Sequence, residues 1–565
     1  QVIYMLIFIG YPIVYNWIIS LQDVTATTLA SAARDFVGLD NFKAIFSDVT
    51  FRKSVLHTFV YTIGCLVIQF SLGFLLAMFF VKKFTLAKPI RGFIVISWML
   101  PVTVTALVFK FMFGESSGII NTILMNLHLI KSPIGWLLKG NTAMVVLIIA
   151  NSWVGIPFNM LLLTTGLNNI PGDVYEAASI DGATSVQKFF KITIPLLKPT
   201  IMSVLILGFV LTFKVFDLVY VMTGGGPVDA TEVLSTYSYK PVFPDIPFRR
   251  RCSCSKCIVY LPVYCCIDIF KNYFKRRNYI NRRKELIMRK IHLRDKQKNI
   301  LLSILAVIIA CIFLFPLYWI IVNSFKIDSE IFSSVPTLWP KKFTITAYKD
   351  LIGNLSVTLK NSVIIAIGSM ILSLVLSVPA AYGLARYKVK GMKLFVLVFL
   401  VTQMLPASLV LTPLFLIFSK LGLLNSYLAP ILSTATISIP FVVLMLRPGF
   451  LSMPKELEDA AKIDGCTSLG VFFRICIPIS KPTVITAACF SFVFGWNDLV
   501  YSMTFNTKDT MRPMTSAIYT YMNQYGTKWN SIMAYGVLLI LPCCIIFLTM
   551  QKHIVEGMTS GSVKG

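Results

Sequence analysis

Charged residues are scarce in this chain. Asp, Glu, Lys and Arg make up 14% of its 565 residues, whereas a soluble protein typically has about 25%. Hydrophobic residues make up 56%, and many lie in runs of about 20 residues or more, long enough to cross the hydrocarbon core of a bilayer. The composition therefore excludes a soluble enzyme and a secreted disulfide scaffold, and it predicts an all-α, multi-pass membrane protein.

Acidic residues are especially few. The chain has 25 Asp and Glu against 52 Lys and Arg, a formal net charge of +27. Such an excess would fit nucleic-acid binding, but the basic residues lie mainly in short loops between apolar runs, where the positive-inside rule expects them. We therefore expect no nucleic-acid partner. The 12 cysteines lie mostly in apolar stretches, where cysteine behaves as a small hydrophobic residue, so we expect no disulfide framework.

Eleven apolar runs predict membrane-spanning helices, five in the first part of the chain and six in the second. The first run begins at Val2 with no basic region before it, so we expect a spanning helix whose upstream residues are missing, and not a signal peptide. The other runs cover roughly 55–81, 93–113, 143–163, 201–222, 300–322, 362–384, 394–418, 429–446, 483–503 and 532–550.

The second part of the chain repeats the first. Residues 166–200 and 449–483, which lie 283 positions apart, align without a gap and share 17 of 35 residues. We predict two homologous six-helix halves: residues 1–247, truncated at the N-terminus, and residues 288–565. Basic residues fill the repeated loops, and Lys82 and Arg386 begin matching basic loops elsewhere. The positive-inside rule therefore places the repeated loops and both ends of each half in the cytoplasm.

Residues 248–287 fit neither half. Five of the twelve cysteines lie here, and Cys252, Cys254 and Cys257 form a C-x-C-x-x-C pattern. One interpretation is a metal site, although no His or further Cys pair completes a tetrahedral ligand set. Another interpretation is a basic cytoplasmic linker.

A frameshift explains more of this junction. One choice of codons for Arg250–Phe270, read one base later, encodes EGAAVANVLFTFLFIAALIF, an apolar run of spanning length where the topology requires a sixth helix. The same frame can end immediately before Met288. We hypothesise that 248–287 contains the frameshifted sixth helix of the first half, and that Met288 is the natural start of a second protein. Resequencing this DNA tests the hypothesis, and a clean open frame with other codons would contradict it.

The repeated loop resembles the EAA loop of ATP-binding cassette (ABC) importer permeases. The matching residues are Glu176, Ala177, Ala178, Asp181, Gly182 and Pro195 in the first half and Asp459, Ala460, Ala461, Asp464, Gly465 and Pro478 in the second. Residues 223–227 (TGGGP) resemble a signature of the first permease of carbohydrate importers, and residues 551–557 (QKHIVEG) are also similar to that family. The resemblance implies first and second permeases of the maltose and multiple-sugar type, joined in one chain. In the second half Asp459 replaces the usual Glu, which keeps the charge but shortens the reach.

The residues of the loop also suit a short helix closed by a tight turn. Asp173 and Glu458 are among the acidic residues that place negative charge near the helix N-terminus, as the helix dipole favours. Gly182 and Gly465 offer a helix stop, because glycine tolerates positive φ. Phenylalanine pairs at 189–190 and 472–473 can anchor the following helix. An ordinary amphipathic loop helix held by packing is the alternative, but its duplication at matched positions favours a function.

The resemblance implies a coupling helix that sits in a cleft of a cytoplasmic ATPase subunit. The chain would then be the permease of a binding-protein-dependent importer for a sugar, an oligosaccharide or a related polyol or glycerol phosphate. It lacks a G-x-x-x-x-G-K-[ST] phosphate loop, so we expect no catalytic or metal site here and expect ATP and Mg²⁺ on an ABC ATPase dimer. An extracytoplasmic solute-binding protein and a bacterial-type plasma (inner) membrane location are also implied.

Polar and aromatic residues in the predicted spans are candidates for the substrate path, because such groups are costly in a membrane and often functional. The candidates are Asn151, Trp153, Asn159, Lys214, Trp496 and Asn497. The alternative is that both tryptophans occupy packing positions. The sequence does not identify the carbohydrate.

Two other classes of function remain for comparison. A twelve-helix, ion-coupled secondary sugar transporter would need a buried ion or proton site near the midplane, and no cluster of membrane acids provides one. A purely structural membrane scaffold would not explain the duplicated loop.

Overall fold

The computed structural model describes residues 1–24, 34–82, 84–239, 295–333, 335–387, 392–403, 406–523 and 526–559. Within these ranges eight helices are long and apolar enough to cross a membrane, or up to ten if two bent helix pairs each form one span. The strands described are two short ones, β1 (Met522–Asn523) and β2 (Gly526–Thr527), paired antiparallel. The prediction of an all-α, multi-pass architecture is confirmed. The junction 248–287, with its cysteines and hypothesised sixth helix, lies outside the described residues.

The first half contains the helices up to residue 239. They are α1 (Val2–Met5), η1 (Leu6–Gly10), α2 (Tyr11–Ser20), α3 (Asp40–Ser47), α4 (Val49–Phe80), α5 (Ala87–Met99), α6 (Val102–Met112), α7 (Ile119–Asn126), α8 (Gly140–Asn168), α9 (Gly172–Ile180), α10 (Ser185–Lys188), η2 (Phe189–Thr193), α11 (Ile194–Phe213), α12 (Asp217–Met222) and α13 (Leu234–Tyr239).

The second half contains the helices from residue 295 onward. They are α15 (Asp295–Ser324), α16 (Asp328–Ile331), α17 (Thr346–Arg386), α18 (Met392–Gln403), α19 (Ala407–Lys420), α20 (Leu428–Ser452), α21 (Glu456–Ile463), α22 (Ser468–Val471), η3 (Phe472–Cys476), α23 (Ile477–Ile479), α24 (Lys481–Trp496), α25 (Val500–Phe505), η4 (Asp509–Met511), α26 (Met514–Ala517), η5 (Ile518–Tyr521) and α27 (Trp529–Thr559).

Several apolar runs are not the straight spans that their length predicted. The run 93–113 bends by 95° between α5 and α6, because Leu100 is extended and Pro101 has no N–H to continue the helix. The runs 201–222 and 483–503 also break, since α11 ends at Phe213 and α24 at Trp496 before the short helices α12 and α25. Apolar length alone does not reveal where a helix ends inside such a run.

The two halves repeat the same close helix packing. In the first half α4 packs on α8, and in the second α17 packs on α20. A Cβ added at Gly64 would lie 2.8 Å from Ile148, and one added at Gly368 would lie 2.5 Å from Ile431. Small residues let membrane helices approach closely. These contacts fix a register in which each residue of α4 corresponds to the residue 304 positions later in α17.

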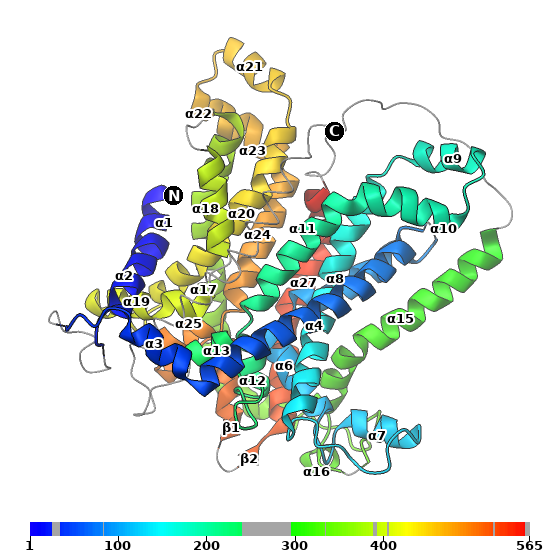
Figure 1. Ribbon diagram of the computed structural model, residues 1–565, viewed down its shortest axis with the longest axis vertical. Coiled ribbons are helices and arrows are strands. Elements are labelled where there is room, and N and C mark those ends of the chain that lie inside the picture. Colours follow the sequence, from blue (N-terminus) through cyan, green and yellow to red (C-terminus); the bar gives the residue numbers. More distant parts are fainter. Residues whose placement is uncertain are drawn as a thin grey trace.

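The first helix of each half packs on the other half (Figure 1). In α2, Asn16 Nδ2 donates to Leu409 O of α19 at 2.6 Å. In α8, Trp153 Nε1 donates to Phe313 O of α15 at 2.8 Å. The halves are therefore interlocked, and if Met288 begins a separate protein, the two proteins would complete each other's fold.

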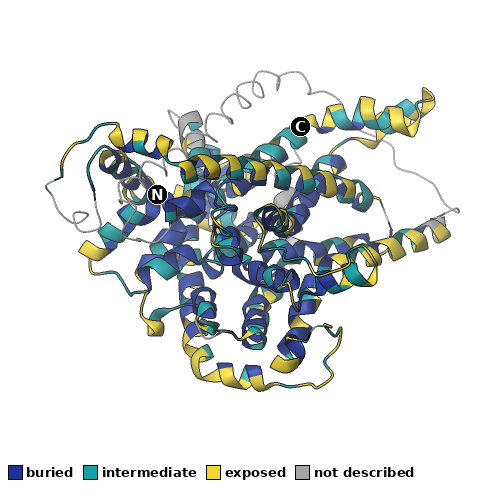
Figure 2. Ribbon diagram, turned by 60° about the horizontal axis from the view of Figure 1, so that its bottom comes forward, coloured by how far each residue is buried: buried dark blue, intermediate teal, exposed yellow. Residues whose placement is uncertain are grey.

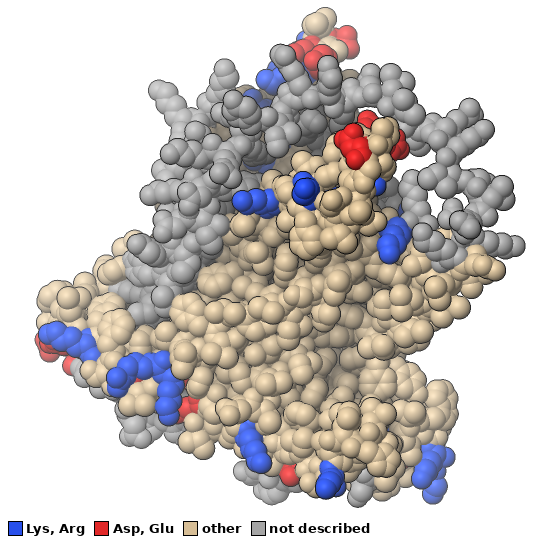
Figure 3. All heavy atoms as spheres, turned by 45° about the vertical axis from the view of Figure 1, so that its right-hand side comes forward, with Lys and Arg blue, Asp and Glu red and all other residues tan. Residues whose placement is uncertain are grey.

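The outer surface matches a lipid environment. Helix α4 exposes Leu56, Val60, Ile63 and Val67 along one face, at the i, i+3 and i+4 spacing of a helical stripe. Buried residues concentrate in the middle of the bundle (Figure 2). On the face shown in Figure 3, charged side chains lie toward the two ends and leave an uncharged band between them. These features are those of a multi-pass membrane protein.

Candidate coupling loops

The two repeated loops lie at the same end of the molecule. In Figure 1, α21 and α22 of the second half stand at the top and α9 and α10 of the first half at the upper right, whereas α7, α16 and the β1–β2 pair lie at the bottom. One partner, or a symmetric pair of partners, can therefore approach both loops from one side.

Each loop begins with a short helix that carries acidic residues in its first turn. Helix α9 starts after Pro171, whose backbone is extended, and has Asp173 in its first turn. Helix α21 has Glu456, Glu458 and Asp459 in its first turn. Negative charge at this end of a helix interacts favourably with the unpaired N–H groups, so both helices are stabilised where they leave the membrane.

Each short helix ends in a Schellman motif centred on glycine. In the first half Ala183 N–H bonds Ala178 O at 2.9 Å and Gly182 N–H bonds Ser179 O at 3.2 Å. In the second half Gly465 N–H bonds Lys462 O at 3.1 Å, and the residue after it bonds Ala461 O at 2.9 Å. The φ angles of Gly182 and Gly465 are +75° and +84°, values that favour glycine.

Matched apolar side chains are exposed on the two loops. Ile180 and Ile463, which lie 283 positions apart, are each 87% exposed. Two further matched pairs on the same loops are exposed: Val186 with Leu469, and Phe190 with Phe473. Exposed apolar clusters mark interaction surfaces. We call these six residues the apolar caps of the loops.

The sequence-predicted loop residues lie on the same two loops as the apolar caps. Glu176 and Asp459, at equivalent positions, are exposed, as are Asp181, Gly182, Asp464 and Gly465. Of the small residues, Ala177 and Ala460 are exposed, whereas Ala461 is buried and Ala178 is half-buried. Pro195 and Pro478 are exposed where each loop returns toward the spanning helices.

The predicted phenylalanine anchors divide into two roles. Phe189 packs against Phe74 of α4, and Phe472 packs against Tyr382 of α17. Their neighbours Phe190 and Phe473 are exposed. Sequence reasoning missed Ile180 and Ile463 of the apolar caps, although the identity of both residues across the repeat was a signal that could have found them.

The candidate path residues are not gathered into one site. Trp153 and Trp496 are buried and donate their indole N–H groups to Phe313 O and Leu539 O at 2.8 and 3.0 Å. Asn159 bonds Gly155 O of its own helix, and Asn151 lies buried nearby in α8. Trp153, Trp496 and Asn159 thus have hydrogen-bond partners within the protein.

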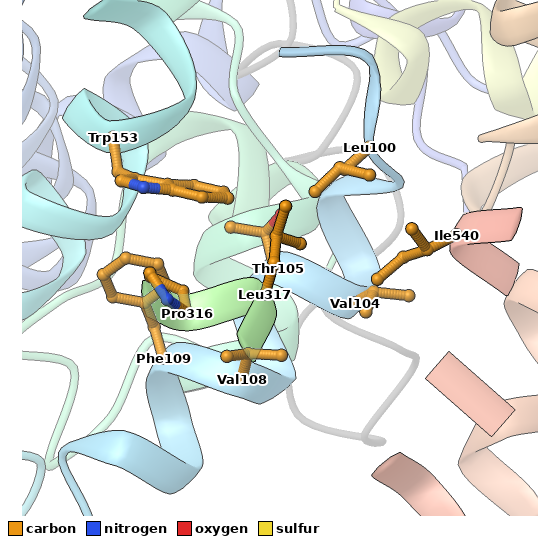
Figure 4. Close-up of a pocket in the computed structure, with 9 residues that line it drawn as sticks. All are labelled: Leu100, Val104, Thr105, Val108, Phe109, Trp153, Pro316, Leu317 and Ile540. Carbon is orange, nitrogen blue, oxygen red and sulfur yellow. The ribbon is translucent and has the colours of Figure 1, made fainter. Parts of the chain in front are cut away.

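Trp153 also borders a small cavity of about 10 Å³ (Figure 4). Its other lining residues include Phe109, Val104, Pro316 and Ile540, so the walls are almost entirely apolar. A cavity of this kind holds no sugar, because it has room for about one water molecule and offers few polar partners.

Replacing Trp153 with Phe will therefore affect stability and not substrate recognition. The ring contact with Phe313, whose centroid lies 5.6 Å away, is largely kept, but the hydrogen bond to Phe313 O is lost. We expect a loss of about 1 kcal/mol in unfolding free energy, measurable by thermal unfolding in detergent. A changed half-saturation concentration for uptake at normal stability would contradict this.

Lys214 and Asn497 lie at equivalent positions on the boundary between the halves. Lys214 Nζ donates to Gln403 O of the second half at 2.6 Å, and Asn497 Nδ2 donates to Met99 O of the first half at 3.5 Å. Both carbonyls lie at the ends of helices, α18 and α5, that stop shortly before a proline. Each side chain thus bonds a carbonyl at a break between two helices of the other half: Lys214 at the break between α18 and α19, and Asn497 at the break between α5 and α6.

No group of three or more His, Cys, Asp or Glu residues able to hold a metal ion occurs within the described ranges. The cysteine cluster of residues 252–266 lies outside them.

Comparison with protein families agrees with this duplicated arrangement. The family described as "Binding-protein-dependent transport system inner membrane component" matches the chain twice, over residues 69–278 and 373–560. Each matched range contains one of the two repeated loops. The repeat in the sequence is therefore a repeat of one whole family unit.

Individual relatives each correspond to about half of this chain. The probable ABC transporter permease protein YurM of Bacillus subtilis is 36% identical over 254 residues, covering 44% of this chain and 84% of the relative. The sulfoquinovosyl glycerol transport system permease protein SmoH of Agrobacterium fabrum is 35% identical and covers 45% of this chain and 89% of the relative. The diacetylchitobiose uptake system permease protein DasC of Streptomyces coelicolor is 29% identical and covers 46% and 96%.

Proposed function

Because this chain belongs, in two copies, to the family of binding-protein-dependent transport system inner membrane components, we propose that it forms the transmembrane pathway of an ABC importer for a carbohydrate. The named systems of its relatives carry sulfoquinovosyl glycerol and diacetylchitobiose, both sugar derivatives. These relationships support an ABC permease and not the ion-coupled secondary transporter.

The observation that carries the proposal is the pair of matched coupling loops. Each presents a short helix with a glycine stop and exposed apolar residues, on one side of the molecule and at positions 283 residues apart. Apolar side chains gain about 25 cal/mol for each Å² that a partner covers. Two ATPase subunits that close on ATP would push both helices together and switch the pathway between inward and outward access.

The proposal assigns the remaining components to other chains. ATP and Mg²⁺ bind to a cytoplasmic ABC ATPase dimer, since the sequence has no phosphate loop of its own. An extracytoplasmic solute-binding protein delivers the carbohydrate to the face opposite α9 and α21. The chain lies in a bacterial-type plasma (inner) membrane with its EAA loops in the cytoplasm, an orientation that the basic residues of these loops support.

Co-purification and inhibition of uptake test the proposal. The tagged chain should retain a soluble ATPase subunit through detergent purification, and carbohydrate uptake into cells should stop with vanadate but persist with an uncoupler. Uptake that collapses with the uncoupler and resists vanadate would instead support the secondary transporter.

A further inference from the structure

A buried ion pair joins the coupling helix of the second half to a membrane-spanning helix. Arg386 is the last residue of α17, and Glu458 lies in the first turn of α21. Arg386 Nε lies 2.5 Å from Glu458 Oε1, and the two side chains are only 7% and 8% exposed. Tyr382 donates its O–H to Glu458 Oε2 at 3.0 Å, and Arg386 Nη2 donates to Met453 O at 2.8 Å. Additional hydrogen bonds of this kind are what a buried ion pair requires to be well held.

The N-terminal half of α17 is tied to a different loop. Asn361 Nδ2 donates to Thr510 O and Arg512 O at 2.9 and 3.0 Å, and Ser362 Oγ accepts from Met514 N–H at 2.8 Å. At 1.5 Å per residue, these contacts lie about 37 Å along the helix from Arg386. Helix α17 therefore connects the coupling helix to the loop around Thr510, which we call the far loop.

Among the described residues, which omit Lys83, the first half shows no matching ion pair at the coupling end. The register between α4 and α17 places Lys82 at the position of Arg386, and the repeated loop places Tyr175 at the position of Glu458. Lys82 is exposed, and Tyr175 Oη instead lies 2.8 Å from Thr193 Oγ1 at the end of η2. Helix α9 is thereby joined to the segment that leads into α11.

Where α17 and α4 contact these loops, the two halves are alike. Thr58 of α4 corresponds to Ser362 of α17, and its Oγ1 accepts from Leu234 N–H at 2.9 Å, as Ser362 accepts from Met514. Within the described residues, a polar tie at both of these positions is therefore seen for α17 and not for α4.

We propose that Arg386 and Glu458 are positioning residues that make α21 and α17 move as one body, so that movement of the second ATPase subunit reaches the far loop directly. In the first half, Tyr175 ties α9 to the segment before α11, so movement of α9 reaches α4 through packing contacts such as that of Phe189 with Phe74. This proposal rests on the proposed function, because it takes ATPase closure as the source of the movement.

Thiol labelling at the two outer loops tests this asymmetry without requiring the transported carbohydrate. Thr510, in the far loop, and Val228, in the corresponding part of the first half, are both exposed. Thr510→Cys and Val228→Cys are made separately, and each purified chain–ATPase complex is reacted with a maleimide before and after trapping with Mg-ATP and vanadate. Labelling of the parent chain's own cysteines is subtracted. We expect trapping to change the labelling rate by about fivefold at each site.

The double substitution R386A/E458A removes both charges, so that neither is left buried without its partner. We expect it to abolish the change at Thr510→Cys while that at Val228→Cys persists and the ATPase stays bound. R386K keeps the charge but loses the Nη2 bond to Met453 O, and we expect it to reduce the change at Thr510→Cys while the Val228→Cys change persists; it replaces the double substitution if that chain does not accumulate. K82A, at the equivalent position, should preserve both changes.

A variant complex that keeps the full change at Thr510→Cys would overturn the proposal, and so would one that loses the change at both sites with the ATPase still bound. If trapping changed neither site in the parent complex, the proposed function itself would fail. The two failures are therefore distinguishable.

Discussion

Replacing Ile180 and Ile463 together by aspartate will leave the chain folded in the membrane but unable to hold its ATPase subunits. Each isoleucine is 87% exposed, so its loss removes almost no internal packing. Covering one isoleucine in a partner's cleft is worth about 2 kcal/mol, so losing both corresponds to about a thousandfold weaker binding. Pull-down of the ATPase with the tagged chain measures this.

Leu129→Asp provides the matched control. Leu129 is also exposed, but it follows α7 at the opposite end of the molecule (Figure 1). We expect this variant to retain the ATPase like the parent chain. Equal ATPase recovery with the isoleucine double variant would show that the apolar caps are not the docking surface.

Replacing Gly182 and Gly465 together by valine will stop vanadate-sensitive uptake. An added Cβ meets nothing within 4 Å at either position, so crowding is not the cause. The cost comes from φ angles of +75° and +84°, at which a residue with a side chain loses about 1–2 kcal/mol and a β-branched residue is a strong outlier. The Schellman turns would open and the coupling helices would lose their ends. Uptake and ATPase recovery should both fall by about tenfold or more.

A valine placed at a helical glycine distinguishes the effect of backbone conformation from the effect of side-chain size. Gly353 in α17 is exposed, has nothing within 4 Å of an added Cβ and lacks a positive φ. Gly353→Val should therefore be tolerated, since valine is a better helix former than glycine. Normal uptake by the Gly182 and Gly465 double variant would contradict a coupling role for these turns.

The sequence was sufficient to predict the features that depend on local pattern. The repeat at a spacing of 283 residues predicts two homologous halves. Gly182 and Gly465 are predicted as helix stops, because a helix end at glycine depends on local backbone conformation alone. Apolar length likewise predicted a multi-pass fold, but it could not show the 95° bend at Pro101, because the run remains apolar across the break.

Features that depend on packing between distant segments could not be predicted in this way. The sequence pattern indicates Arg386 as a basic loop residue and Glu458 as a charge that the helix dipole favours, yet together they form a buried ion pair. Similarly, the sequence indicates Trp153 as a path residue, but in the structure its indole N–H donates to Phe313 O of α15, a helix of the other half. Patterns within one helix do not report which other helix covers it.

Transport by purified components in lipid vesicles tests the central claim most directly. The chain is reconstituted with its ATPase subunits and solute-binding protein, and uptake of radiolabelled carbohydrate is compared with that of vesicles from which only the ATPase is omitted. Our account predicts ATP-dependent accumulation in the complete vesicles and none without the ATPase. Accumulation at an undiminished rate in vesicles that lack it would contradict the account.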